Sequence, residues 1–403
     1  MIRRTGELTD TVRLYYESAY IKEFRAKVLS CSKAEKAWVT VLDRSAFYPE
    51  GGGQPCDTGV LLLQYKALTA VTDVREKDGL LLHYCDSYIE PGTAVTGRID
   101  WKRRFDHMQQ HSGEHIVSGM ICKYFECDNV GFHMGKEFVT IDYNADIDMG
   151  KIREIEAAAN RYIWENHAMV ELHSEGSDKD LPEFRSKKEI SGDIRIISFP
   201  GADTCACCGT HVSFSAEVGL VKFISCRRFT KGSRIELLCG KRAFDYLSMN
   251  MEQNGAVAAA MAASPDKTAA VYEKQRAELI ADKLRIGELE KKYNDAVTER
   301  FKGSEDVLLF EDNASMDSIR RLCVTLAEGC SGVCAVFSGT GDNYRYAVSD
   351  GTSDDNSLIK RMNERLNGRG GGKGSFGQGS VNASRAEIEA FFSSIRKQNG
   401  DAK

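Results

Sequence analysis

The sequence predicts an α+β protein of several domains. The chain has 403 residues, which is enough for two or three domains that each bury a core. The apolar pattern changes from strand-like to mixed near residue 101, and to long helices near residue 240. We expect four parts in chain order: a β-barrel-like subdomain (1–100), an α+β metal domain (101–240), a helical spacer (241–302) and a small α/β domain (303–403).

Charge and composition narrow the class of protein. The net charge of −5 argues against a protein that coats nucleic acid with its whole surface, although basic residues gather at 102–104 and 360–373. The 13 cysteines show no disulfide framework, no long apolar run occurs, and residues 1–5 do not begin a signal peptide. We therefore expect a soluble protein of the cytoplasm, where thiols stay reduced.

Short strands separated by turn residues fill the first hundred residues. Asp78-Gly79 is a typical hairpin turn. Residues 47–57 contain three consecutive glycines flanked by prolines, so we expect a loop whose backbone can approach a ligand closely. The strand-like runs are residues 37–41, 60–63, 70–74 and 80–84.

The second segment mixes helices and strands. Apolar periodicity predicts helices at residues 103–124 and 151–167. Cys205, Cys207 and Cys208 fall in a loop between two predicted strands. The strand-like runs of this segment are residues 137–143, 194–199, 218–225 and 233–239.

Residues 240–301 are rich in Ala, Glu, Lys and Arg and predict helices. Ser264-Pro265 interrupts the pattern, since serine suits an N-cap and proline the first helical position. A short antiparallel helical hairpin or coiled coil, and with it a homodimer, is plausible because apolar residues recur every seven positions. These are Tyr272, Leu279, Ile286 and Tyr293.

The last hundred residues predict a separate α/β domain with a glycine-rich connection at residues 368–379. That segment fails the P-loop pattern because Gly374 stands where Ser or Thr should follow the lysine. It is interpreted as a flexible linker or as a backbone cradle for RNA phosphate, with Arg369, Gly371, Gly372 and Lys373 as the binding residues. The predicted strands are residues 307–310, 333–338 and 344–348, and the predicted helices are residues 357–366 and 384–396.

Two pairs of residues have the spacing of metal ligands. His111 and His115 lie four apart on a predicted helix, which places both imidazoles on one face, and Cys207 and His211 form an equally compact pair. A thiolate with imidazoles suits zinc better than magnesium or calcium, which prefer oxygen ligands. Histidines four apart are often ordinary surface or core residues, but the two pairs together favour a zinc site.

Four protein ligands alone favour a structural zinc, because catalytic zinc usually keeps a position for water. The glycine-rich loop with Gln54, and the polar side chains near the first histidine pair, would supply a pocket and favour catalysis. Those polar neighbours are Gln109, Gln110 and Ser112.

These motifs resemble a known family. The segments 46–55 (AFYPEGGGQP), 111–115 (HSGEH), 207–211 (CCGTH) and 233–236 (SRIE) look like the editing domain of alanyl-tRNA synthetase and its free-standing relatives, the AlaX proteins. The end of the chain is similar to the DHH-associated domain that closes alanyl-tRNA synthetase. The resemblance covers nearly the whole chain and identifies it as a long-form AlaX protein without an aminoacylation domain.

The resemblance implies a trans-editing deacylase. Such a protein hydrolyses the ester between a wrong amino acid, serine or glycine, and the 3′ end of alanine tRNA. Carried over by position, His111, His115, Cys207 and His211 would hold Zn2+, and Gln54 would line the amino-acid pocket. Ser45 stands where family members often have Thr, whose hydroxyl recognises serine. Selectivity follows if alanine leaves the pocket's polar groups unpaired.

Two other readings stay open. His111-Ser112-Gly113-Glu114-His115 also satisfies H-x-x-E-H, a metallopeptidase pattern in which Glu114 is the general base. The Cys-x3-His pair is not what such peptidases use. In the third reading, a closed structural zinc stabilises an RNA-binding protein that has no activity.

Overall fold

The computed structural model describes residues 10–63, 67–175, 182–186, 193–230, 232–351 and 357–400. It forms two compact units, Met1–Ala256 and Val257–Lys403, which we treat separately. The finer division into four parts stays a prediction. Residues 1–5, from which no signal peptide was expected, lie outside the described residues. No described helix is long and apolar enough to cross a membrane.

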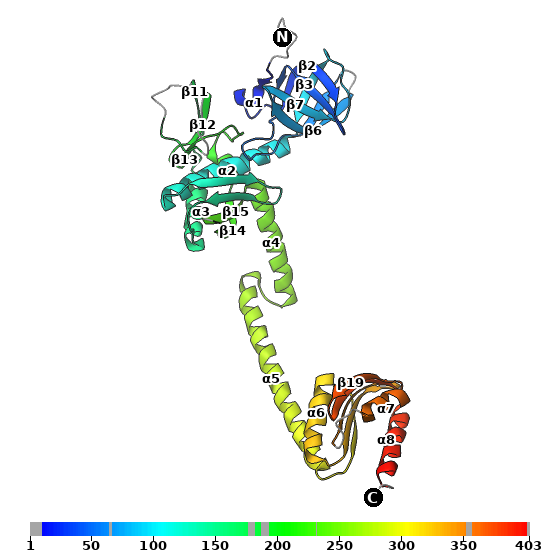
Figure 1. The fold of residues 1–403 in the computed structure, drawn as a ribbon. Helices are drawn as coiled ribbons and strands as arrows, with labels where there is room; N and C mark the ends of the chain where they lie inside the picture. Colours follow the sequence, from blue (N-terminus) through cyan, green and yellow to red (C-terminus); the bar gives the residue numbers. More distant parts are fainter. Residues whose placement is uncertain are drawn as a thin grey trace. The chain divides into compact units, whose positions relative to one another are not determined.

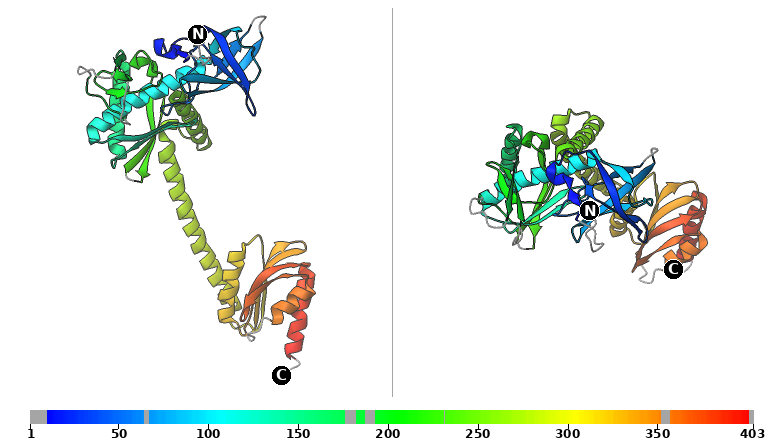
Figure 2. Two further views of the ribbon diagram at one scale, coloured as in Figure 1. Left: turned by 45° about the horizontal axis from the view of Figure 1, so that its top comes forward. Right: turned by 90° about the horizontal axis from the view of Figure 1, so that it is seen from above.

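A closed six-stranded barrel begins the first unit (Figures 1 and 2). Its side chains alternate between core and surface, as in β7, where Leu81, His83 and Cys85 are buried. The predicted hairpin turn joins β6 to β7, with positive φ at both Asp78 and Gly79. In barrel order the strands are β2 (Glu23–Lys33), β3 (Trp38–Leu42), β7 (Leu80–Cys85), β6 (Leu68–Lys77), β5 (Gly59–Leu62) and β8 (Ala94–Ile99).

Short elements flank the barrel. They are β1 (Val12–Arg13), α1 (Leu14–Glu17) and β4 (Arg44–Ser45), with β1 and β4 paired in parallel. The glycine-rich segment after β4 is a loop, as predicted, with only an isolated bridge between Gly51 and Gln54. This loop leaves the barrel and reaches β9 of the next layer, since the Met134 amide donates to the Gly53 carbonyl at 3.1 Å.

The long helix α2 (Trp101–Phe125) links the barrel to the rest of the unit (Figure 2). It starts at Asp100, whose side chain accepts from the Arg103 amide, and ends at Glu126 in the left-handed conformation. Most of its residues from position 107 to 122 are buried, because other elements cover it on several sides. Gly119 permits one close approach: a Cβ there would lie 2.2 Å from the Ala202 carbonyl oxygen.

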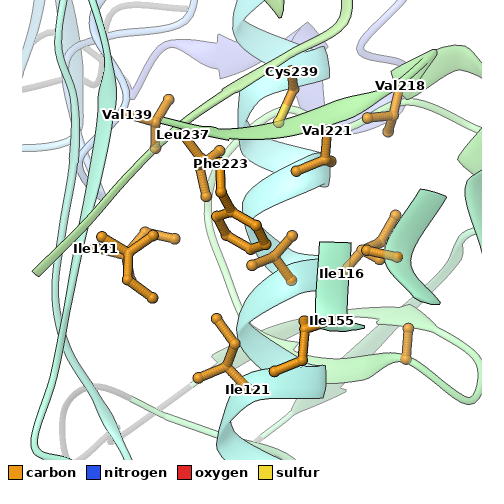
Figure 3. Packing of buried hydrophobic residues seen from close by; sticks show 14 of the residues in the cluster. Ile116, Ile121, Val139, Ile141, Ile155, Val218, Val221, Phe223, Leu237 and Cys239 are labelled. Atoms are coloured by element: carbon orange, nitrogen blue, oxygen red, sulfur yellow. The ribbon is translucent and has the colours of Figure 1, made fainter. Parts of the chain in front are cut away.

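Two antiparallel sheets and a helix surround α2. Ile116 and Ile121 of α2 pack with Phe223 and Leu237 of the four-stranded sheet (Figure 3). That sheet has the order β14 (Val221–Phe229), β15 (Gly232–Cys239), β10 (Val139–Tyr143) and β9 (Asn129–Met134). The three-stranded sheet is β11 (Val170–Glu175), β12 (Asp193–Phe199) and β13 (Asp203–Ala206), and the helix is α3 (Met149–Trp164).

The start of β14 differs from the prediction. The strand expected from residue 218 begins at Val221, because residues Ser215–Val218 form a 3-10 helix. The Glu217 carboxylate closes this turn by accepting from the amides of Ser213 and Phe214, both at 3.0 Å. Local side-chain capping thus shortens the strand.

The expected helical segment consists of α4 (Gly240–Ala260) and α5 (Thr268–Phe301). The predicted break is confirmed, since Pro265–Lys267 form a short 3-10 helix between them. The heptad-spaced residues Tyr272, Leu279, Ile286 and Tyr293 are about half exposed on α5. Whether they pair with another helix stays a prediction.

A five-stranded sheet forms the core of the second unit, with α6 (Met316–Gly329) on one face and α7 (Ser357–Arg365) and α8 (Arg385–Gly400) on the other (Figure 1). The prediction omitted α6. The strand order is β16 (Val307–Glu311), β17 (Val333–Thr340), β18 (Asn343–Asp350), β20 (Phe376–Asn382) and β19 (Arg369–Lys373). Only the β16–β17 pair is parallel.

The flexible-linker interpretation of residues 368–379 is wrong, because they contribute the β19–β20 hairpin. The glycines allow the two strands to approach without side-chain clashes. A Cβ on Gly372 would lie 1.8 Å from the Phe376 carbonyl oxygen, and Gly374 at the turn has a φ of +65°. Glycine serves close pairing here rather than flexibility.

Candidate metal centre

Four predicted ligand residues converge at one buried point of the first unit. One ligand atom from each of His111, His115, Cys207 and His211 lies within 4.8 Å of the other three. The first two project from α2, and the other two lie in the loop that follows β13. The fold therefore brings together two pairs that are about ninety residues apart in sequence.

The thiol of Cys207 lies close to the Nε2 atoms of the surrounding imidazoles. Its Sγ is 3.5 Å from Nε2 of His111 and 3.3 Å from Nε2 of His211. All three imidazole rings contact one another, with centroids 4.5 to 5.3 Å apart. A thiolate with three imidazole nitrogens is a donor set that matches zinc.

The outer nitrogens of the histidines have three different partners. Gln54 Oε1 is 2.9 Å from Nδ1 of His111, and Ser112 Oγ is 3.1 Å from Nδ1 of His211. Asp203 Oδ2 is 3.0 Å from Nδ1 of His115. The hydrogen bonds to Nδ1 of His111 and His211 fix the orientation of these two rings and leave Nε2 available as a ligand, which is the arrangement around protein-bound metals. Asp203 also forms an ion pair with Arg185 at 2.7 Å.

The electrostatics of the cluster favour a cation. Burial by itself raises the pKa of Cys207, but the neighbouring imidazoles outweigh it and hold the pKa well below its usual value. Burial lowers the pKa of His211 well below its usual value, so this ring is neutral. Burial opposes the charge of His115, yet the Cys207 thiolate and the Asp203 carboxylate raise its pKa well above normal. The residues fit a bound transition metal.

Arg195 of β12 holds the loop that carries Cys207. Its Nη1 atom donates to the carbonyl oxygens of Cys207 at 3.0 Å and Gly209 at 2.7 Å. The other guanidinium nitrogens pair with both carboxylate oxygens of Glu171 at 2.6 and 2.7 Å. Gly209 must lack a side chain, since a Cβ would lie 2.1 Å from Cε1 of His111.

Gln54 is fully buried and joins the glycine-rich loop to the cluster. Its Nε2 donates to Thr210 Oγ1 at 2.9 Å, and its Oε1 also accepts from the Thr210 amide at 3.1 Å. Phe132 of β9 stacks on His111 with ring centroids 5.1 Å apart, and it fills the space that a side chain on Gly53 would need. The loop, α2 and β9 thus enclose one side of the cluster.

Ser45, at the end of β4, is fully buried, and its side chain makes two hydrogen bonds. His83 Nδ1 is 3.1 Å from the Thr40 carbonyl oxygen, which can only accept, so Nδ1 carries the proton and Nε2 is an acceptor. The Ser45 hydroxyl therefore donates to His83 Nε2 at 2.8 Å, and it accepts from the Phe47 amide at 3.1 Å. One lone pair of Ser45 remains available.

The other predicted residues contribute no ligand atom to the cluster. Glu114 is buried, and its Oε1 accepts from Ser118 Oγ and Asn129 Nδ2, both at 2.7 Å. Arg369, Gly371, Gly372 and Lys373 are exposed on β19 of the second unit. Their roles in catalysis or RNA binding stay predictions.

Sequence reasoning missed Asp203, Arg195 and Thr210. Thr210 lies within the CCGTH segment, in which the sequence indicated only Cys207 and His211. Asp203 and Arg195 carry no local signal, because their contacts depend on how β12 and β13 pack beside α2 and the ligand loop.

The chain is similar to alanyl-tRNA editing proteins and to alanine–tRNA ligases. The family model for tRNA synthetases class II (A) matches residues 5–103, and the model for the threonyl and alanyl tRNA synthetase second additional domain matches residues 194–236. The chain is 29% identical to the alanyl-tRNA editing protein AlaX-L of Pyrococcus horikoshii, over 93% of this chain and 96% of that protein.

Two further relatives share only part of their length with the chain. The alanine–tRNA ligase of Pyrococcus furiosus is 36% identical over 59% of this chain and 27% of its own length. The mouse alanyl-tRNA editing protein Aarsd1 is 28% identical over 58% of this chain and 60% of its own. Among solved structures, the C-Ala domain of Aquifex aeolicus alanyl-tRNA synthetase aligns with 24% of this chain and 93% of its own at 16% identity, with a TM-score of 0.20 that supports no conclusion.

Proposed function

Because the chain belongs to the AlaX-type alanyl-tRNA editing proteins, we propose that it hydrolyses the ester of mischarged alanine tRNA, with seryl-tRNA and glycyl-tRNA as substrates. The observation that carries the proposal is the convergence of the four-residue cluster with Gln54 at one buried point. The chain spans nearly all of AlaX-L but only about a quarter of the ligase.

We propose zinc as the cofactor, held by His111, His115, Cys207 and His211. Zinc would supply a Lewis acid beside the scissile ester. The chain's own residues supply the frame: Gln54, Ser112 and Asp203 orient the rings, and Arg195 holds the ligand loop. The closure by the glycine-rich loop and Phe132 limits access of bulk water to the cluster.

Discrimination against alanine is proposed to use Ser45. Since its proton is donated to His83, Ser45 can only accept a further hydrogen bond, and the hydroxyl of a serine substrate can donate it. Alanine would leave the remaining acceptor position of this buried oxygen unfilled, which disfavours hydrolysis of correctly charged alanyl-tRNA. Glycine lacks the same hydroxyl, so this contact predicts a preference for seryl-tRNA.

The metallopeptidase reading is less consistent with the geometry. A general base must accept a proton from water, but Glu114 Oε1 already accepts two hydrogen bonds in the core.

We propose tRNA as the partner, with Arg369, Gly371, Gly372 and Lys373 contacting RNA. The exposed apolar residues of α5 would support a homodimer.

The decisive test is amino-acid release from alanine tRNA charged with serine, glycine or alanine. The proposal predicts fast release of serine, slower release of glycine and little release of alanine. Hydrolysis of unstructured peptides without deacylation would favour the peptidase. Tight tRNA binding without any release would favour a structural zinc protein.

A further inference from the structure

A polar groove of about 730 Å³ opens on the sheet of the second unit. It lies at the ends of β18, β19 and β20 that are remote from the Gly374 turn. Its lining contains two arginines and several hydroxyl and amide side chains, and no carboxylate. The lining therefore combines positive charge with hydrogen-bond donors.

The strand register aligns the two arginines in one row. Arg345 of β18 is opposite Ser380 of β20, and Ser380 is opposite Arg369 of β19. Directly opposed residues point to the same face of a sheet, so Ser380 stands between the two arginines. Neighbouring strands are about 4.8 Å apart, which places the arginine backbones roughly 10 Å apart. Their long side chains can hold one phosphate or two successive phosphates between them.

This part of the sheet face is open because α6 covers only the neighbouring rows of the same face. Val336 and Ala347 lie under α6, one row further along the same face. Tyr344 and Val381 point to the opposite face and pack in the core with α7 and α8. The row that contains Arg345 and Ser380 lies beyond the residues that α6 covers, and both are exposed.

Neither arginine has an acidic partner among the described residues. Glu311, two strands from Arg345 in the same row, accepts instead from Tyr293 Oη at 2.6 Å. Most other arginines that lie in sheets of this protein are paired, as Arg234 is with Asp142 at 2.6 Å. Two unpaired guanidinium groups beside each other repel, so an anion between them is favourable.

We infer that this groove docks the phosphodiester backbone of the tRNA, an inference that rests on the proposed function for its choice of RNA. Asn343 and Asn382, paired across the same strands, add amide donors and acceptors for phosphate and ribose oxygens. The only aromatic residue in the lining, Tyr344, is buried, so no ring is presented for base stacking. The groove reads the RNA backbone, not the base sequence.

The groove is a different site from the turn of the glycine-rich hairpin. Lys373 is opposite Phe376 beside the turn, whereas Arg369 and Ser380 lie at the other end of the same strands. Arg345 belongs to neither strand of that hairpin. Substitution of Arg345 therefore tests the groove without changing the hairpin.

The test measures binding of uncharged alanine tRNA to the full-length protein by fluorescence anisotropy at several salt concentrations. Arg345→Gln is expected to weaken binding roughly tenfold and to lower the slope of log affinity against log salt by about one, because a phosphate contact is lost. Ser380→Asp, which inserts a carboxylate between the arginines, is expected to weaken binding at least as much. Arg320→Gln removes an exposed arginine of α6 outside the groove and serves as the matched control.

If both Arg345→Gln and Ser380→Asp keep the wild-type tRNA affinity and salt slope, the groove does not dock RNA. Equal weakening by Arg320→Gln would also overturn it, because the effect would then be one of net charge. Protection of the variants by inorganic phosphate against unfolding, without any change in tRNA affinity, would show a free-anion site and contradict RNA docking. Uncharged tRNA keeps the result independent of deacylation, so failure of the proposed function remains distinguishable.

Discussion

The amide oxygen of Gln54 lies 2.9 Å from Nδ1 of His111, which links the glycine-rich loop to the helix that carries two of the proposed metal ligands. The same oxygen accepts from the Thr210 amide, beside the second ligand pair. One side chain thus contacts both halves of the cluster. The glycine-rich loop is therefore part of the candidate site, where its Gln54 side chain contacts a proposed metal ligand.

Gln54→Ala should therefore reduce metal affinity. It leaves Nδ1 of His111 and the Thr210 amide without their partner, and loss of such support typically costs about 10- to 100-fold in affinity. Competition with a chelator measures the change. Gln253→Ala, at an exposed position of α4, is the control and should bind zinc like wild type. Equal zinc affinity in Gln54→Ala would show that this contact does not support the ligand.

Arg104→Met should destabilise the first unit by about 3–5 kcal/mol, because it leaves the buried Asp57 carboxylate unpaired. Arg104 is fully buried and also donates to the carbonyls of Ala19 at 2.8 Å and Ala46 at 2.5 Å. Arg98→Met removes an exposed pair with Glu23 and should cost no more than about 1 kcal/mol. Urea unfolding compares the two, and similar losses would contradict the assignment.

Glu114→Gln should retain zinc and deacylation, with a smaller effect than Gln54→His, which adds a ring where Gln54 contacts Thr210. The reason is that Glu114 bonds within the core and contributes no ligand atom to the cluster. Turnover of seryl-tRNA and metal content are measured together. Abolished turnover in a protein with full zinc content would instead identify Glu114 as a general base.

The buried His83 should make stability depend on pH. Burial lowers its pKa from the ordinary 6.5 to about 4, so between these values the unfolded chain binds the proton and the native protein does not. Stability should therefore fall as pH drops from 6.5 towards 4, by up to about 1.4 kcal/mol per pH unit from this group. His83→Gln should lose this part of the dependence, whereas His133→Gln, at an exposed position, should keep it. Identical slopes in urea unfolding for wild type and His83→Gln would refute the account.

The sequence predicted elements well where the local signal and the packing agree. The helix predicted at 103–124 is Trp101–Phe125, because Asp100 caps it and apolar residues continue to its end. The helix α6 was missed although Ser315 is its N-cap and Ile319, Leu322 and Leu326 have helical spacing. The β19–β20 hairpin was missed for a physical reason: glycine disfavours strands locally, and only pairing beside β18 stabilises them.

The candidate site also has residues that local sequence patterns predict and residues that they do not. The ligand pairs are short local patterns, so spacing alone could place His111 beside His115 and Cys207 beside His211. Asp203 could not be predicted because its contact to His115 arises only when β13 packs against α2. Residues that orient ligands come from tertiary structure, and local patterns do not reveal them.

The central claim is that deacylation depends on one metal held by this cluster. Zinc should be removed with a chelator and returned in steps while release of serine from seryl-tRNA of alanine tRNA is measured in the same samples. The account predicts that activity rises with zinc up to about one equivalent per chain. Cys207→Ala should stay inactive at every zinc level, whereas Cys208→Ala, which removes the adjacent exposed thiol, should follow the wild type. Full activity of the metal-free protein, or of Cys207→Ala, would contradict the claim.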